Sequence, residues 1–357
     1  MQSPWRVGLV GVGRGSGYGR LFADEPRCEV SAVCDISPEA LERFGRELNL
    51  PDSRCFADYG DFVASGLDIV FVGTPMPFHA EQAIAALEAG CHVLSEVTMA
   101  TSVADCGRII EAVRRTGQTY MLAENCIYWH FVSEFKARVQ AGKLGEIFYA
   151  EAEYLHPIPS LIYDRATGEK KWRFSRAPLH YCTHSLGPLL DITGDRVVRT
   201  CGLGQGHRLL PEAPIGGIDL QVALMETNRG MIIKLLRSSV IPRRPAIHYY
   251  GLHGTKGYAE TDRGGPAGPG RLYIEGEMDR DQEIEVPLSD PSLPESARAG
   301  GHGTAEYSLI RDFLGSLERG EKPRIDEIRG ADMTVPGLIA HESAMRGGEW
   351  LDVPSFA

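Results

Sequence analysis

The sequence predicts an α/β protein with a doubly wound parallel sheet at its N-terminus, followed by an α+β domain with a large open, mainly antiparallel sheet. In the first 125 residues short apolar strands alternate with helices, which is typical of a parallel sheet with right-handed crossovers. After residue 126 long strand patterns follow one another through short turns. A chain of 357 residues is long enough for two domains, which we expect at 1–125 and 126–357.

The N-terminal strands are expected as short apolar runs that are covered on both faces, as in a parallel sheet. One helix is especially well marked, because Ser37 is a good N-cap and Pro38 suits the first turn. Leu41, Phe44 and Leu48 then fall on one face of that helix. Strands are predicted at 7–10, 30–34, 68–72, 92–94 and 119–123, and helices from about 18, at 38–48, at 80–89 and at 103–115.

The C-terminal part combines long strands with a few helices. Asn228-Arg229-Gly230 is a hairpin signal between two strand patterns. Strands are predicted at 147–154, 218–226, 231–240, 247–252 and 257–260, helices at 131–140, 305–317 and 332–346, and loops at 261–271 and 287–303. Because one broad face of such a sheet has to be covered, we expect a homo-oligomer, a dimer or tetramer.

Composition excludes several classes of function. The net charge of −11 disfavours nucleic acid and anionic membranes as partners. No apolar run approaches the roughly 20 residues of a membrane helix, and we find no signal-peptide pattern, so we expect a cytoplasmic protein. The eight cysteines include no pair separated by two residues, which argues against a zinc ribbon or a redox dithiol.

A glycine-rich loop, Gly11-Val12-Gly13-Arg14-Gly15-Ser16-Gly17, follows the first strand and opens a helix. Gly11 permits a tight turn and Gly13 a close backbone approach to a pyrophosphate, although Ser16 takes the place of the third glycine. Asp35 ends the second strand, where a carboxylate binds ribose hydroxyls and repels a 2′-phosphate. This pattern predicts a Rossmann domain that binds NAD through Gly11, Gly13, Arg14, Gly15, Ser16 and Asp35. Alternatively, the loop only turns the chain and Asp35 caps a helix.

Thr74-Pro75-Met76-Pro77-Phe78-His79 and, after the next strand, Glu96 complete a familiar arrangement. With these segments the whole chain resembles the glucose–fructose oxidoreductase / inositol dehydrogenase (Gfo/Idh/MocA) family. The resemblance implies further cofactor contacts at Thr74, Pro75, His79, Glu96, Asn125, Trp172 and Arg173. Trp172 is equally well explained as a packing residue.

The usual catalytic machinery of that family is altered here. The family's Glu-Lys-Pro segment reads Glu96-Val97-Thr98, so Val97 stands where a lysine is expected. A later helix is expected to carry His180 and His184 without the family's aspartate. Two histidines one helical turn apart suit a metal, but no third ligand has suitable spacing, so we expect no metal site.

Other groups take the place of the lysine. The segments around Glu124, Tyr154-Leu155-His156, Tyr181-Cys182-Thr183-His184 and Gly301-His302-Gly303 resemble the NAD-dependent glycosidase branch of the family. That branch includes α-N-acetylgalactosaminidases, and the resemblance implies a carbohydrate substrate. It also implies transient oxidation of a sugar hydroxyl at C3, loss of the C2 proton, elimination of the anomeric group, addition of water and return of the hydride.

The resemblance assigns catalytic roles to Glu124, Tyr154, His156, Tyr181 and His184. His184 or His156 would manage the hydroxyl proton, Tyr154 or Tyr181 the C2 proton, and Glu124 the orientation of the sugar or a histidine. Tyr154 is alternatively a core aromatic and His156 a loop residue. Two other functions therefore stay open: a net sugar or polyol dehydrogenase that uses histidine or tyrosine, and a non-catalytic NAD-binding sensor.

Overall fold

The computed structural model describes residues 3–211, 217–264 and 268–357. The chain divides into two compact units, described here one at a time. The first comprises Met1–Tyr128, Ser289–Ala331 and Phe356–Ala357, and the second comprises Trp129–Leu288 and Asp332–Ser355. Residues 289–331, which we expected in the C-terminal domain, thus belong to the first unit. No helix in the described ranges is long and apolar enough to cross a membrane.

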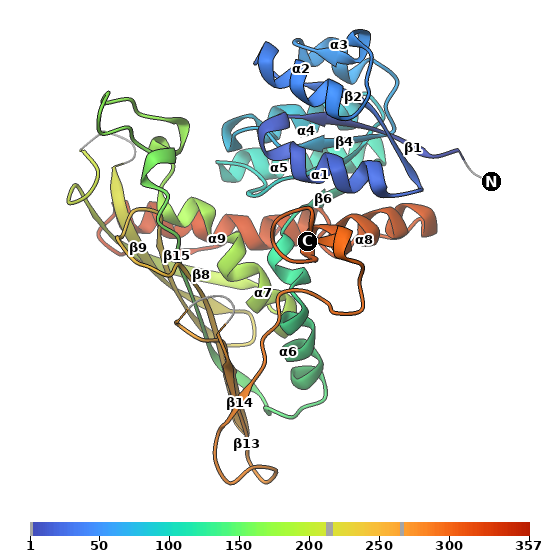
Figure 1. Ribbon diagram of the computed structural model, residues 1–357. Helices are drawn as coiled ribbons and strands as arrows, with labels where there is room; N and C mark the ends of the chain where they lie inside the picture. The colour runs from blue at the N-terminus through green and yellow to red at the C-terminus, as the bar shows by residue number, and fades with distance from the viewer. Residues whose placement is uncertain (1–2, 212–216, 265–267) are drawn as a thin grey trace. The chain divides into compact units, whose positions relative to one another are not determined.

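The first unit is built on a parallel sheet with the strand order β3-β2-β1-β4-β5-β6, which confirms the doubly wound topology. Its central strands are apolar and buried, as predicted: every residue of β4 is buried. In Figure 1 the sheet appears in blue to cyan, with α1 and α4 beside it. The strands are β1 Trp5–Val10, β2 Cys28–Cys34, β3 Cys55–Phe56, β4 Ile69–Val72, β5 His92–Ser95 and β6 Tyr120–Leu122.

One helix of this unit begins at the cap that the sequence predicts. Ser37 caps α2, because its hydroxyl accepts a hydrogen bond from the backbone N–H of Ala40 at 3.2 Å. Leu41 and Phe44 of the same helix are buried, as the periodicity predicted. The helices are α1 Val12–Asp24, α2 Pro38–Glu47, α3 Tyr59–Val63, α4 His79–Glu88, α5 Val103–Thr116 and α8 Ala305–Arg319.

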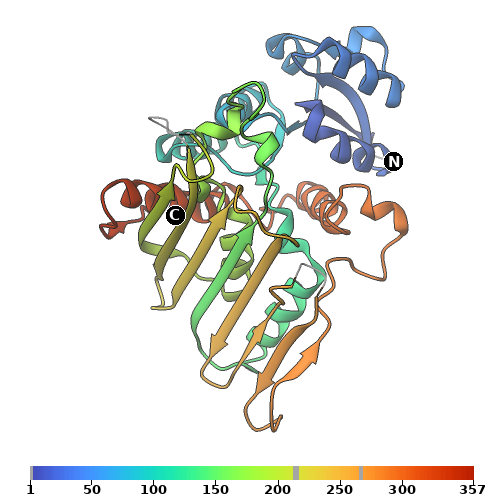
Figure 2. The same ribbon diagram turned by 60° about the vertical axis from the view of Figure 1, so that its left-hand side comes forward.

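The second unit is built on a large mixed sheet, which Figure 2 shows face on. Its strand order is β14-β13-β12-β11-β7-β10-β9-β8-β15, and in the described ranges only β7 and β10 pair in parallel. The predicted hairpin joins β9 to β10, with Ile232 opposite Glu226. The strands are β7 Ile147–Leu155, β8 Val197–Gly206, β9 Ile218–Thr227, β10 Ile232–Ser238, β11 Ile247–Gly254, β12 Gly257–Glu260, β13 Gly270–Ile274, β14 Gln282–Ile284 and β15 Leu351–Asp352.

Helices cover one face of this sheet. They are α6 His130–Gln140, α7 Thr183–Thr193 and residues 332–345 of α9, which spans Glu327–Met345 (Figure 2). Along β10 the residues facing them, Ile233, Leu235 and Arg237, are buried. Residues 265–267, in the loop expected at 261–271, lie outside the described residues. The loop is also shorter than expected, because β13 begins at Gly270.

Candidate functional site

The glycine loop of the first unit has the geometry of a phosphate-binding turn. Gly11 has a left-handed φ of 81°, and a Cβ there would lie 2.5 Å from the backbone nitrogen of Thr74, so only glycine fits. Gly13 is exposed at the start of α1, and a Cβ added to it would meet nothing within 4 Å. The loop therefore leaves room for a pyrophosphate at the N-terminus of α1. Nothing is described of the side chains of Arg14 and Ser16.

Asp35 lies beside this loop at the carboxyl end of β2. Its carboxylate accepts hydrogen bonds from the backbone N–H groups of Val12 at 2.9 Å and Ser37 at 3.0 Å. These two bonds fix the carboxylate, which stays partly exposed, next to the N-terminus of α1. The neighbouring Ile36 is 94% exposed and offers an apolar surface. A dinucleotide fits this arrangement, with its ribose hydroxyls on Asp35 and its purine against Ile36.

His79 holds two loops of the first unit together. Its imidazole is buried, with Nδ1 2.8 Å from the backbone oxygen of Thr98 and Nε2 2.8 Å from that of Thr74. Burial lowers the pKa of His79. Pro75 precedes a short 3-10 turn, Met76–Phe78, that leads directly into α4. His79 therefore fixes the backbone of Thr74 beside the Gly11 turn.

The segment after β5 contains the replaced lysine position. Glu96 is buried, and its carboxylate accepts a hydrogen bond from the backbone N–H of Val97 at 3.1 Å. Val97 is 4% exposed, so an apolar side chain fills the lysine position. This segment offers no general base at residue 97.

Glu124 and Asn125 follow β6 and are both buried. The Glu124 carboxylate accepts a hydrogen bond from the backbone N–H of Cys126 at 3.1 Å. The Asn125 amide donates to Glu306 at 3.0 Å, and the same carboxylate oxygen lies 2.5 Å from Nδ1 of His302. Glu306 thus links the loop Gly301-His302-Gly303 to Asn125. Our sequence analysis did not select Glu306.

Two Tyr–His pairs come together in the second unit. The Tyr154 hydroxyl lies 2.7 Å from Nδ1 of His156, and the Tyr181 hydroxyl lies 3.1 Å from Nε2 of His184. The rings of Tyr154 and His184 meet edge to face, with centroids 5.8 Å apart. Four of the predicted catalytic residues therefore form one cluster: Tyr154 near the end of β7, His156 just after it, Tyr181 at the end of the 3-10 turn Pro178–Tyr181, and His184 in the first turn of α7.

His248 also belongs to this cluster, although sequence reasoning did not select it. It is opposite Tyr154 in the register of β11 and β7, and the two ring centroids are 3.8 Å apart. Its ring centroid lies 6.0 Å from that of His184. On the next helix-facing position of β11, the Tyr250 hydroxyl donates to the backbone oxygen of His184. Only the strand pairing, which the sequence does not fix, reveals this neighbour.

Two arginines place positive charge on the tyrosine rings. The Arg237 guanidinium carbon lies 4.2 Å from the centre of the Tyr154 ring, and that of Arg176 lies 4.4 Å from the centre of the Tyr181 ring. Neither arginine forms an ion pair with a carboxylate in the described ranges, and the Nε of each is buried without a hydrogen-bond partner there. Burial, and next the charge of Arg237, lower the pKa of Arg176 to about 9. The sequence offered one indication of this arrangement: Arg237 is a charged residue on the face of β10 that otherwise consists of buried apolar residues.

His180 does not lie on the same helix as His184, contrary to the sequence prediction. Pro178 begins a 3-10 turn, Pro178–Tyr181, and α7 starts only at Thr183. The ring of His180 packs against that of His341, with centroids 4.6 Å apart. Burial, and then His341 and Arg176, lower the pKa of His180 to about 3.

Trp172 and Arg173 also belong to the second unit, in the 3-10 turn Trp172–Ser175. Both side chains are partly buried, and the Arg173 guanidinium carbon lies 4.3 Å from the centre of the Trp172 ring. The other residues that we predicted to bind the cofactor belong to the first unit, as does Glu124.

Relatives of known sequence cover nearly the whole chain. A glycosyl hydrolase family 109 protein from Saccharopolyspora erythraea is 28% identical over 98% of this chain and 83% of its own length. A protein of the same name from Shewanella pealeana is also 28% identical, over 98% of this chain and 85% of its own.

Solved structures with the same fold include an oxidoreductase domain protein from Kribbella flavida, with a TM-score of 0.84 at 21% identity over 99% of this chain and all of that one. A levoglucosan dehydrogenase in complex with NADH and L-sorbose has a TM-score of 0.85 at 20% identity, again over 99% of this chain and all of that one.

The family model for the oxidoreductase family with the NAD-binding Rossmann fold matches residues 5–124. This range includes the Gly11 turn, Asp35 and His79 with its two hydrogen-bond partners, the backbone oxygens of Thr74 and Thr98. Residues 5–124 of this chain therefore match the NAD-binding Rossmann domain of the Gfo/Idh/MocA oxidoreductase family, and the cofactor is NAD.

Proposed function

We propose that this protein cleaves a glycoside by transient oxidation of a sugar hydroxyl, with NAD regenerated in each turnover. The observation that carries the proposal is the pair of Tyr–His contacts in the second unit, at 2.7 Å and 3.1 Å, in a chain whose lysine position holds Val97. The relatives named glycosyl hydrolase family 109 support the same assignment.

When bound, NAD supplies a hydride acceptor for a sugar carbon and later a hydride donor. The chain supplies two sites for protons. In each pair, the phenol oxygen takes a proton from the substrate as its own proton passes to the imidazole. We assign the Tyr154–His156 and Tyr181–His184 pairs to the hydroxyl proton and the C2 proton; which pair handles which proton stays open.

Arg176 and Arg237 suit the negative charge that such proton transfers create. Their guanidinium groups lie over the two tyrosine rings and have no carboxylate partner among the described residues. A fixed positive charge in a buried site stabilises a developing phenolate or enolate oxygen and needs no rearrangement during the reaction.

The test is incubation with NAD and a panel of α- and β-aryl glycosides, following NADH absorbance and released phenol together. We expect phenol to be released without accumulation of NADH. Tyr154→Phe should lower the rate by about 10²-fold or more, because it removes a positioned acid–base group. Tyr149→Phe is the matched control, since it alters a tyrosine on the opposite face of the same strand.

Accumulation of NADH in step with loss of substrate would contradict the glycosidase and identify a net sugar dehydrogenase. Binding of NAD with no turnover of any sugar, unchanged in His184→Ala, would identify a sensor instead.

A further inference from the structure

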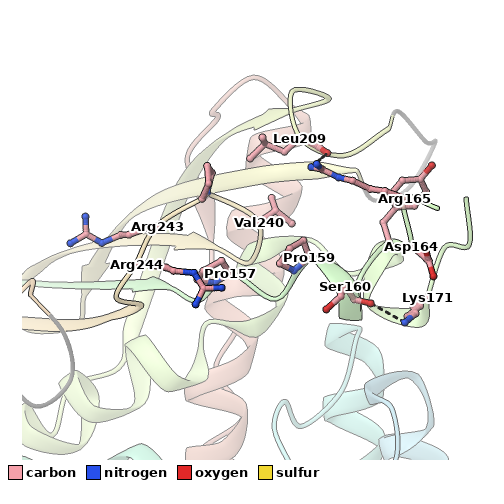
Figure 3. Close-up of a pocket in the computed structure, with 12 residues that line it drawn as sticks. Pro157, Pro159, Ser160, Asp164, Arg165, Lys171, Leu209, Val240, Arg243 and Arg244 are labelled. Atoms are coloured by element: carbon pink, nitrogen blue, oxygen red, sulfur yellow. Dashed lines mark hydrogen bonds between the residues drawn. The ribbon is translucent and has the colours of Figure 1, made fainter. Parts of the chain in front are cut away.

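The second unit contains a pocket of about 900 Å³ (Figure 3). The pocket lining includes Pro157, the residue that follows His156, and Val240, which lies two residues after the end of β10. The two bordering segments are joined by backbone hydrogen bonds from His156 N to the Ser238 oxygen at 3.1 Å and from Ile158 N to the Ser239 oxygen at 2.8 Å. A molecule bound near Tyr154 and His156 therefore has this pocket next to it.

The pocket has an apolar floor. Val240 belongs to a small buried core, and Leu209 and Tyr163 pack against that core from the pocket side. The floor is fixed by Asp219, a buried residue whose carboxylate accepts hydrogen bonds from the N–H groups of three consecutive residues. These are Arg208 at 2.7 Å, Leu209 at 3.0 Å and Leu210 at 3.0 Å. A tyrosine and apolar side chains suit the flat C–H faces of sugar rings.

The rim of the pocket is cationic. Arg165 and Lys171 lie at one end and Arg243 and Arg244 at the other, as Figure 3 shows. Within the described ranges none of these four side chains forms an ion pair. The acidic side chain in the lining, Asp164, accepts hydrogen bonds from the backbone N–H groups of Ala166 and Thr167, which lower its pKa, and the charge of Lys171 lowers that pKa further. Arg165, Lys171 and Arg243 donate only to backbone oxygens in the described part of the chain, those of Leu209, Ser160 and Arg263. Positive charges gathered in this way in one pocket of a chain with a net charge of −11 point to an anionic ligand.

Positive charge continues from the rim to the Tyr–His cluster. Arg176, over the Tyr181 ring, donates from Nη2 to the Ser239 hydroxyl at 3.3 Å, and Ser239 immediately precedes Val240 of the pocket floor. Arg237, over the Tyr154 ring, belongs to β10 and lies three residues before Val240 in the sequence. The cationic side chains therefore extend from the reacting tyrosines into the pocket.

We propose that the pocket binds the remainder of an acidic saccharide, one that carries carboxylate or sulfate groups, while the reacting sugar occupies the Tyr–His cluster. This proposal rests on the proposed function, because it names the substrate class of the same site. The carboxylates of uronic acids and sulfate esters share the chemistry that arginine recognises, bidentate acceptance of N–H groups.

The test is isothermal titration calorimetry of the NAD-loaded full chain with tetragalacturonate, with a sulfated chondroitin disaccharide and with neutral cellotetraose. We expect at least one acidic saccharide to bind about tenfold or more tightly than the neutral one, as two charge-assisted hydrogen bonds provide, with affinity that falls as salt rises. The comparison between the uronate and the sulfate identifies the anion.

Arg165→Gln and Lys171→Gln should each weaken binding of the acidic saccharide, whereas Arg280→Gln, an exposed arginine of the same unit outside the pocket, should not. Arg244→Gln repeats the test at the other end of the pocket. Equal binding of neutral and acidic saccharides, or unchanged affinity in the pocket variants, would overturn the proposal. Tyr154→Phe separates the two proposals, because it should lower turnover of aryl glycosides by about 10²-fold or more and leave saccharide binding in the pocket intact.

Discussion

Asp35 caps the glycine loop, and we predict that it also selects the cofactor; a single substitution separates these two roles. Its carboxylate holds the N–H groups of Val12 and Ser37, and its charge is expected to select NAD over NADP. Asp35→Asn keeps a hydrogen-bond acceptor of the same size and removes the charge. We expect the ratio of NAD to NADP affinity to fall by about tenfold or more, because the repulsion of a 2′-phosphate is lost.

Calorimetric titration of each dinucleotide measures that ratio. Asp52→Asn, an exposed aspartate in the turn before β3, is the matched control for loss of charge. An unchanged ratio in Asp35→Asn would show that Asp35 only caps the loop, the alternative left open by the sequence.

At the scale of a single element, the N-cap of α2 by Ser37 is expected to contribute measurably to the free energy of unfolding. Ser37→Ala removes the hydrogen bond from Ala40 N–H to the Ser37 hydroxyl, 3.2 Å long. We expect the free energy of unfolding to fall by about 1 kcal/mol, the usual value of an N-cap. Chemical denaturation measures the change, and Ser53→Ala, an exposed serine outside α2, should have no such effect.

Elements with strong local signals were predictable, and those that depend on distant partners were not. The capped helix α2, the apolar strand β4 and the hairpin at Asn228–Gly230 follow from neighbouring residues alone. By contrast, β15 has two residues and exists only because it pairs with β8, so no periodicity marks it. The four Tyr and His residues that we propose as catalytic were predicted from motifs, whereas His248 and Arg176 enter the cluster through strand pairing and loop packing.

At the scale of the whole molecule, buried histidines make stability depend on pH. Burial lowers the pKa of His79 and His92 in the first unit and of His180 and His341 in the second. Below pH about 6.5 the unfolded chain binds protons at these histidines that the folded chain does not, so acid favours unfolding. We expect stability to be full above that pH and to decline below it, by up to about 1.4 kcal/mol per pH unit for His180, whose pKa in the folded chain is about 3.

Urea unfolding at pH 7.5, 6.5 and 5.5 measures this decline. His341→Gln removes one titrating group and should make the decline shallower. Stability that stays constant or increases from pH 7.5 to 5.5 would rule out a destabilising contribution from these histidines.

The division of the chain also affects how it is made. The unit that binds NAD includes residues 289–331, and within it the N–H of Leu122 in β6 donates to the backbone oxygen of Ile325 at 3.0 Å. Domains commonly fold in order as they leave the ribosome, the N-terminal one first. Here the N-terminal domain lacks α8 and the Ile325 segment until most of the 357 residues have been synthesised. The nascent chain therefore completes both units almost together, at the end of translation.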